Sequence, residues 1–382
     1  MKLMKRICSI VLAVTMLAGC GTASTAKTTA SASASASASA IPAEVTITDH
    51  ADRTVTVPTD PEKVAILDIY PLPSLLTVYL NSADSIVAME PVSMNAAKAG
   101  ILSQLYPDIL NVNTDIMNGD DVNMEALAAL QPDVVFYNAA KKDEAQQLED
   151  AGLTAVGISA TKFNYDAIKT YQEWMSLLDQ IYPDYAGKRG TQAGDYASQV
   201  YNEVQDKVKD VTDKQKVLFL YQYDDTAMVT SSSKFFGQWW CDAVGAANVA
   251  QDVPADNMNA KITMEQVYEW NPDVIIITNF TKTTPDDLYN NAIGSDDWSS
   301  VKAVQDKRVY KMPLGVYRTY TPGIDTPLTL EWLAQAVYPD LFSDVDVASD
   351  VKDYYNKLFG VTLTDDQISA MYTPNRDAGS WN

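Results

Sequence analysis

The sequence predicts an α/β protein made of two similar lobes. Three observations support this prediction: strand-like runs alternate with helix-like periodicity from Val64 onward, one segment occurs twice at a fixed offset, and a purely helical stretch separates the two halves. About 340 residues follow the leader described below, and this length exceeds the size at which a single hydrophobic core usually stops growing. The hydrophobic fraction of 47% is sufficient for two cores.

The strand-like runs are short hydrophobic stretches bounded by turn residues. Before them, Val45 to Ile47 and Thr54 to Val57 flank a charged turn and predict a small hairpin. The strands expected in the two halves are Val64 to Ile69, Ile86 to Met89, Asp133 to Tyr137, Thr154 to Ile158, Lys216 to Tyr221, Ala227 to Thr230, Asp273 to Thr278 and Arg308 to Met312.

The repeated segment is a helix followed by a strand. Asn123 to Phe136 matches Thr263 to Ile276 at a constant offset of 140 residues. Each copy begins with a helix-capping residue, has Glu in the first helical turn and continues through Pro-Asp into a hydrophobic run. Because both copies follow the same order of features, we interpret the two halves as related lobes.

The stretch between the halves predicts two helices that meet at Pro183 and Asp184. Their hydrophobic residues recur every three or four positions, which places them on one face of each helix. These residues are Ile168, Tyr171, Met175, Leu178 and Tyr182 in the first helix and Tyr196, Val200, Val204, Val208 and Val211 in the second. We expect this segment to connect the lobes stiffly.

The N-terminus has the features of an export signal. Lys2, Lys5 and Arg6 precede a hydrophobic run that ends at Ala18 and is too short to span a bilayer stably. The run closes on Leu-Ala-Gly-Cys, which resembles the bacterial lipobox and implies a lipid on Cys20. The Ser, Ala and Thr residues that follow cannot form a core, so they predict a disordered tether that reaches roughly 25 Å.

These features divide the chain into five parts. We expect a signal peptide over residues 1–19, the lipidated cysteine and linker over 20–41, an N-terminal α/β lobe over 42–163, a helical segment with the interdomain helix over 164–212, and a C-terminal α/β lobe over 213–382.

Composition excludes several classes of function. The formal net charge is −22, and loss of the three leader cations leaves −25, so nucleic acid is not an expected partner. Cys241 is the only cysteine outside the leader and the lipidated position, so no intramolecular disulfide can form. His50 is the only histidine, which excludes a multi-histidine metal site. No nucleophile or nucleotide-binding motif is present. We expect no enzyme, and a carboxylate-based glycosidase is the least excluded alternative.

Several segments resemble the substrate-binding lipoproteins of ABC importers, in the group that carries siderophores, haem and cobalamin. The segments that carry the resemblance are the repeat, Asp49 to Pro58, Pro61 to Val64, Val244 to Ala250, Glu331 to Ala334 and Tyr338 to Phe342. The resemblance implies two Rossmann-like lobes, a long interdomain helix and a ligand cleft between the lobes. It also implies docking onto a permease dimer through one Glu of each lobe, Glu125 and Glu265.

Ligand residues are expected in the loops that follow the parallel strands. Those loops are rich in aromatic residues and contain one arginine. The candidates are Tyr70, Glu90, Tyr137, Asn138, Tyr221, Tyr223, Trp239, Asn279, Tyr317 and Arg318. Aromatic faces with one cation favour an iron-siderophore-like chelate, which would be carried rather than used as a cofactor.

Alternatives remain open at this point. The same importer role would suit a corrinoid, haem or an oxyanion such as molybdate, and a surface receptor or assembly factor that binds a protein is a different class. We expect a monomer with no bound metal ion of its own. Its expected location is the outer face of the cytoplasmic membrane of a single-membrane bacterium, where the lipid holds it near its permease.

Overall fold

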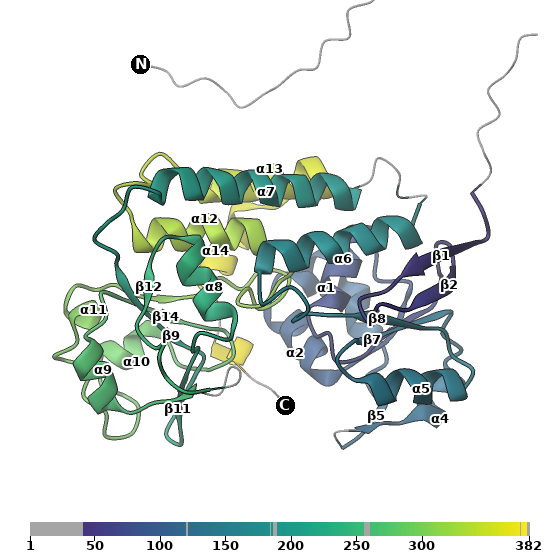
Figure 1. Ribbon diagram of the computed structural model, residues 1–382, viewed down its shortest axis with the longest axis horizontal. Coiled ribbons are helices and arrows are strands. Elements are labelled where there is room, and N and C mark those ends of the chain that lie inside the picture. Colours follow the sequence, from purple (N-terminus) through teal and green to yellow (C-terminus); the bar gives the residue numbers. More distant parts are fainter. Residues whose placement is uncertain are drawn as a thin grey trace, which may run out of the picture. The chain divides into compact units, whose positions relative to one another are not determined.

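Two parallel four-stranded sheets form the centres of the two lobes (Figure 1). The computed structural model describes residues 41–119, 121–183, 185, 189–255, 260–374 and 376–379. Cys20, the signal peptide and all but the last residue of the linker lie outside the described residues. The two-lobed α/β fold predicted from the sequence is confirmed.

The N-terminal lobe is built on the sheet β4-β3-β7-β8. All its strands are parallel, and most of their residues are buried because helices cover both faces. The sheet strands are β3 (Val64–Ile66), β4 (Ile86–Met89), β7 (Val134–Asn138) and β8 (Ala155–Ile158). The other elements are β1 (Glu44–Thr48), β2 (Thr54–Pro58), α1 (Leu72–Leu80), α2 (Pro91–Ala99), α3 (Leu102–Leu105), η1 (Pro107–Asn111), β5 (Met117–Asn118), β6 (Asp121–Val122), α4 (Met124–Ala129) and α5 (Lys142–Asp150).

The C-terminal lobe repeats this plan with the sheet β12-β9-β14-β15 and adds the antiparallel sheet β10-β11-β13. The parallel strands are β9 (Lys216–Leu220), β12 (Ala247–Asn248), β14 (Val274–Ile277) and β15 (Val309–Lys311). The remaining elements are β10 (Gln222–Tyr223), β11 (Met228–Thr230), β13 (Ala260–Lys261), α8 (Phe236–Ala243), α9 (Met264–Trp270), α10 (Pro285–Tyr289) and α11 (Lys302–Gln305).

The internal repeat forms the same structure twice. In each lobe a short helix, α4 or α9, precedes a central strand, β7 or β14. The aspartate of each Pro-Asp step binds the start of the neighbouring strand: the carboxylate of Asp133 accepts from the Lys63 N–H at 2.8 Å, and that of Asp273 accepts from the Lys216 N–H at 2.8 Å. The matched geometry confirms that the sequence repeat is a structural one.

A layer of helices lies along one side of both lobes (Figure 1). It consists of α6 (Ala167–Ile181), α7 (Arg189–Val208), α12 (Thr326–Val337), α13 (Val347–Phe359) and α14 (Asp365–Tyr372). Helix α7 packs on α6, which contacts β1 of the N-terminal lobe, and on α8 and α12. It therefore contacts elements associated with both lobes.

The pairing of α6 with α7 is close and well bonded. A Cβ atom at Gly190 would lie 2.4 Å from the carbonyl oxygen of Met175, so only glycine permits this approach. The Asp179 carboxylate accepts from the backbone N–H groups of Gly190 and Thr191 at 2.8 and 2.7 Å, which satisfies donors at the start of α7. These contacts stiffen the connection between the lobes.

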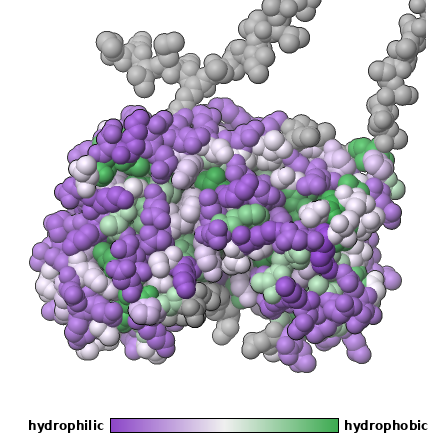
Figure 2. Space-filling model, viewed as in Figure 1, coloured by the Kyte–Doolittle hydropathy of each residue, from purple (hydrophilic) through white to green (hydrophobic). Residues whose placement is uncertain are grey.

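Polar residues dominate the face of the molecule seen in Figure 2, where hydrophobic residues occur only in scattered groups. His50 is partly buried. Its ring packs edge-on against Phe163 with centroids 5.5 Å apart, and its Nδ1 accepts from the Ser159 N–H at 3.2 Å. Burial lowers the pKa of His50 to about 4, so the ring is neutral near pH 7.

Candidate ligand cleft

The first wall of the cleft is formed by the loops after β3, β4 and β7. The Glu90 carboxyl group, 6% exposed, accepts from the Asp68 N–H at 2.5 Å and so joins the ends of β3 and β4. Lys141, in the loop after β7, pairs with Asp68 and lies 3.5 Å from a carboxylate oxygen of Glu144. Three acidic groups therefore gather around one lysine at this edge of the sheet.

Burial raises the pKa of Glu90 to about 7, and the nearby Asp68 carboxylate adds to the effect. The pKa of Glu144 is raised to about 7 by burial and by the same aspartate. Near neutral pH the carboxyl groups of Glu90 and Glu144 are consequently partly protonated.

We expect the pH dependence of stability to report on Glu90. A carboxyl group whose pKa is higher in the folded than in the unfolded protein stabilises the fold below its ordinary pKa of 4.5, and this contribution disappears as the pH rises through about 7. Glu90→Gln should therefore raise the free energy of unfolding at pH 8 by about 1 to 3 kcal/mol and change it little at pH 4.5. Urea unfolding at both pH values measures this. The exposed Glu62→Gln is the control, and an equal change at both pH values would contradict the assignment.

The second wall comes from the loops after β9, β14 and β15. Arg318 is 1% exposed, and its guanidinium carbon lies 5.0 Å from the ring centroid of Phe280 and 5.8 Å from that of Tyr317. Tyr221 stacks on Phe280 with centroids 5.0 Å apart. A buried cation thus sits among aromatic rings, an arrangement that attracts an anion but leaves the rings available for apolar contact.

The loop that carries Arg318 is anchored from the helical layer. Asp325 accepts from the Tyr355 hydroxyl at 2.6 Å and from the Val316 N–H at 3.0 Å. Burial raises the pKa of Asp325 to about 6, while these two hydrogen bonds favour its ionised form. The Asn279 amide donates to the carbonyl oxygens of Met312 and Pro313 at 2.8 Å each, which fixes the start of the same loop. These hydrogen bonds of Asp325 and Asn279 therefore fix the loop that carries Arg318.

A partly buried lysine orders the loop that follows β14 and contains Phe280. The Lys311 ammonium group donates to the carbonyl oxygens of Thr278, Thr281 and Thr283 at 2.8, 2.6 and 2.8 Å. Burial lowers the pKa of Lys311 to about 7, whereas the three carbonyl acceptors favour the charged form. The amine fills a cage of backbone oxygens and ties β15 to the loop after β14.

The two walls meet closely near Arg318. The Ile101 N–H donates to the Gly315 carbonyl oxygen at 3.3 Å, and a Cβ atom at Gly100 would lie 2.5 Å from that oxygen. The space between the start of α1 and the Arg318 loop is a cavity of 10 Å³, lined in part by Pro71, Ser74 and Tyr317. That volume holds about one water molecule.

Six of the ten ligand candidates lie on or beside these walls, namely Tyr70, Glu90, Tyr221, Asn279, Tyr317 and Arg318. Tyr70, Tyr317 and Arg318 all lie close enough to Tyr221 to affect the pKa of its hydroxyl group. Glu90 lies close enough to Tyr317 to affect the pKa of that hydroxyl group. Burial raises the pKa of Tyr317 to about 12, against the effect of Arg318. Asn138 uses its side-chain oxygen within its own loop, accepting from the Ala140 N–H at 3.1 Å.

Three candidates make their contacts away from the walls beside Arg318. The expectations for Tyr137 and Trp239 are corrected, whereas Tyr223 lines a separate pocket of the C-terminal lobe. Tyr137 is fully buried in the core of the N-terminal lobe, with Arg53 5.2 Å from its ring centroid. Tyr223 donates its hydroxyl hydrogen to Asp296 and accepts from the Trp298 indole at 2.9 Å. Trp239 stacks on Tyr201 of α7 with centroids 6.2 Å apart, so it belongs to the helical layer.

Three further residues of the walls were missed by sequence reasoning: Asp68, Lys141 and Phe280. All three follow parallel strands closely, so the strand-end rule could have found them. Asp68 also adopts a positive φ of 56°, an uncommon conformation for a residue other than glycine.

The two expected docking residues lie in equivalent places. Glu125 and Glu265 are exposed in the first turns of α4 and α9. These helices lie on the side of the lobes opposite to the helical layer (Figure 1). The Thr263 side chain and the backbone N–H of Glu265 itself lower the pKa of Glu265, which keeps it negatively charged.

Within the described ranges, no group of three or more His, Cys, Asp or Glu side chains is arranged to hold a metal ion. Nor does that part of the chain contain a helix of the length and hydrophobicity needed to cross a membrane.

Two α/β lobes, a stiff helical connection and a cleft at the carboxyl ends of the strands define a two-lobed solute-binding protein. Residues 75–314 match the periplasmic binding protein family, and the chain belongs to this family. The molybdate-binding protein MolA of Haemophilus influenzae is 28% identical over 349 residues, which cover 86% of this chain and 94% of MolA.

Solved structures agree with this assignment. A periplasmic solute binding protein of Veillonella parvula is 30% identical and superimposes with a TM-score of 0.78, covering 86% of this chain and 97% of its own. Haemophilus influenzae MolA bound to molybdate has a TM-score of 0.65 at 24% identity, covering 84% of this chain and 99% of its own. The family predicted from the sequence is confirmed. The chain is a substrate-binding protein of the ABC importer type, and its relatives are solute-binding proteins of transporters rather than enzymes.

Proposed function

We propose that this protein captures a small oxyanion of the molybdate type in the cleft beside Arg318 and delivers it to an ABC permease. The observation that carries the proposal is the burial of Arg318 at the meeting of the two lobes, on a loop held by Asp325 and Asn279. A guanidinium group presents five N–H donors in a plane, which suits the oxygen atoms of a tetrahedral oxyanion.

The small space beside Arg318 favours a small anion over a bulky chelate. The cavity measures 10 Å³, room for about one water molecule, so any ligand requires the two walls to move apart. A drug-sized molecule, whose pocket occupies about 300 to 1,000 Å³, requires the larger movement. Because the stiff pair of helices α6 and α7 connects the lobes, the lobes would have to separate further to admit a bulky ferric siderophore than to admit a small anion. The siderophore expected from the aromatic residues stays a prediction, and the kinship with a molybdate-binding relative supports the smaller ligand.

The anchor and the docking residues complete this function. We propose that a lipid on Cys20 holds the protein at the outer face of the cytoplasmic membrane, and that the linker lets it reach the permease. Glu125 and Glu265, one on each lobe, would contact basic residues of the two permease subunits. Exposed charges of this kind increase the rate of association at low salt.

The ligand assignment is tested by calorimetric titration of the purified protein. Molybdate and tungstate should bind with 1:1 stoichiometry, because both are tetrahedral dianions of similar size, and a ferric catecholate chelate should not bind at the same concentrations. Saturable binding of the ferric chelate without binding of molybdate would overturn the oxyanion proposal in favour of the siderophore. Absence of both would favour a receptor for a protein.

A further inference from the structure

The C-terminal end of the described chain lies beside the loop that carries Arg318. Helix α14 ends at Tyr372, and the carbonyl oxygen of Met371 accepts from the Leu314 N–H at 2.8 Å. This bond brings the end of α14 to the loop that carries Arg318. Beyond it, a short 3-10 helix, η2 (Arg376–Gly379), turns back over the C-terminal lobe.

Arg376 and Gly379 both contact the C-terminal lobe. Arg376 donates to Asp287 at 3.1 Å, and Asp287 also accepts from the Thr284 N–H at 2.8 Å as part of the cap of α10. Gly379 lies directly on the loop after β14: a Cβ atom there would be 2.2 Å from the carbonyl carbon of Thr281. Residue 379 therefore fits this seat only without a side chain.

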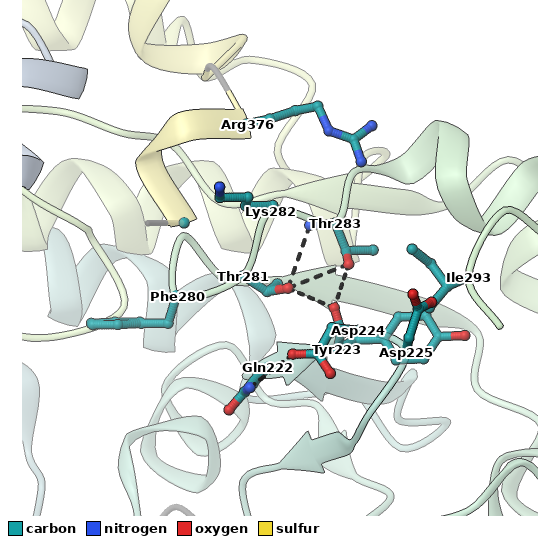
Figure 3. A pocket seen from close by; sticks show the side chains of 11 residues that line it. Gln222, Tyr223, Asp224, Asp225, Phe280, Thr281, Lys282, Thr283, Ile293 and Arg376 are labelled. Carbon is teal, nitrogen blue, oxygen red and sulfur yellow. Dashed lines mark hydrogen bonds between the residues drawn. The ribbon is translucent and has the colours of Figure 1, made fainter. Parts of the chain in front are cut away.

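The seat itself is rigid. The hydroxyl groups of Thr281 and Thr283 both donate to the carbonyl oxygen of Tyr223, as Figure 3 shows, and the Lys311 ammonium group binds the carbonyl oxygens of the same two threonines. A short loop with this many internal bonds keeps its shape, so it offers η2 a fixed surface.

The short helix η2 also contacts α2 of the N-terminal lobe. The residue that precedes α2 is Glu90, which belongs to the first wall of the cleft. Between η2 and its seat is a pocket of 290 Å³ lined by Arg376, Gly379 and Phe280, among others (Figure 3). Phe280 also contacts Arg318, so one aromatic ring separates this outer pocket from the inner cavity.

We propose that residues 376–379 form a strap that closes the entrance of the cleft and must move for a ligand to enter or leave. The strap contacts both lobes, and the ion pair of Arg376 with Asp287 and the close packing at Gly379 help to fasten it to the C-terminal lobe. The Arg376 side chain is 54% exposed, and ion pairs open to water are weak, so the strap can open without unfolding either lobe. That the strap controls entry and release of a ligand rests on the proposed function. That it controls access to the cleft does not.

Access is tested first without any ligand. In the full chain with Cys8→Ser and Cys20→Ser, Ser93→Cys introduces a thiol on α2, where the native hydroxyl donates to the Tyr70 carbonyl oxygen at 2.8 Å. The remaining Cys241 is fully buried, and burial raises its pKa, so it contributes little to labelling. The rate of modification by an aromatic disulfide reagent then reports on how often the cleft is open.

Three changes to the strap should increase that rate at least fivefold: a chain that ends at Pro374, Gly379→Val, and Arg376→Ala. Lys357→Ala removes a positive charge from an exposed ion pair far from the strap and serves as the control, with an unchanged rate. Thermal unfolding verifies that each variant is folded. A rate within a factor of two of the parent for both the truncated chain and Gly379→Val would overturn the proposal.

Molybdate then tests the consequence for ligand exchange. In stopped-flow fluorescence, the truncated chain should bind and release molybdate at least fivefold faster than the parent, because the barrier lies on the path in both directions. Unchanged rates together with unchanged labelling would refute the strap. If neither protein binds molybdate, the proposed ligand is wrong, and the labelling rates alone decide whether the strap exists.

Discussion

Arg318→Gln should weaken molybdate binding about a hundredfold or more. The side chain is buried beside Tyr317 and Phe280, where water cannot replace its hydrogen bonds to an anion. Loss of one partner from a buried charge pair typically costs about 2 to 5 kcal/mol, which corresponds to a loss of affinity of roughly thirtyfold to several thousandfold, and the expected value lies within this range. Calorimetric titration at pH 7 measures the effect directly.

Two further variants make the Arg318 result specific. Arg318→Lys keeps the charge but loses the planar set of donors, so it should recover only part of the affinity. Lys357→Gln removes an exposed positive charge elsewhere and should leave the affinity within a factor of two. If Arg318→Gln binds molybdate as tightly as the parent while remaining folded, Arg318 does not contact the ligand and the oxyanion site must be placed elsewhere.

The double variant Glu125→Arg with Glu265→Arg should abolish uptake into cells while leaving the affinity for the ligand within a factor of two. Both carboxylates are exposed on α4 and α9, so neither reversal disturbs a core. Each reversal would place a cation against a basic surface of the permease, and like charges in contact cost several kcal/mol. Uptake of labelled molybdate and titration of the purified variant provide the two measurements.

A charge-matched control separates docking from net charge. Glu44→Arg with Glu62→Arg changes the net charge by the same amount at exposed positions of the N-terminal lobe and should leave uptake intact. Each single reversal at Glu125 or Glu265 should reduce uptake partly, because the other lobe can still dock. Normal uptake by the double variant would rule out docking through these residues.

Most of the fold could be predicted because its strands are short hydrophobic runs between turn residues. The strand β4 was predicted with its observed bounds, Ile86 to Met89, and the other parallel strands that were predicted differ by one to three residues at their ends. The two-residue strand β12 (Ala247–Asn248) was not predicted. The repeat was equally visible, since the Pro-Asp step has a physical role in both copies: Asp133 and Asp273 each bind the start of a neighbouring strand.

The site was less predictable because burial on both faces of a parallel sheet hides the direction of a side chain. Tyr137 and Asn138 are adjacent in β7, and hydrophobicity alone does not tell that Tyr137 points into the core toward Arg53. The chain after β9 forms the extra strand β10, which places Tyr223 in a pocket of the C-terminal lobe instead of beside Arg318. Trp239 was misplaced because the orientation of α8 depends on its packing against α7.

Other features depend on contacts between distant segments and leave no local signal. Lys311 binds three carbonyl oxygens of a loop about thirty residues earlier in the chain. The fit of Gly379 against Thr281 likewise requires the C-terminus to return to the loop after β14. In the sequence, Lys311 looks like an ordinary surface lysine and Gly379 like an ordinary glycine near the C-terminus.

The close pairing of α6 with α7 has a consequence for transport itself. If the helices keep the distance between Glu125 and Glu265 nearly constant, the empty and the loaded protein present almost the same pair of charges to the permease. An empty carrier would then occupy the transporter almost as readily as a loaded one. Import should consequently slow when the carrier is overproduced at limiting substrate, because unproductive complexes compete with productive ones for a fixed number of permeases.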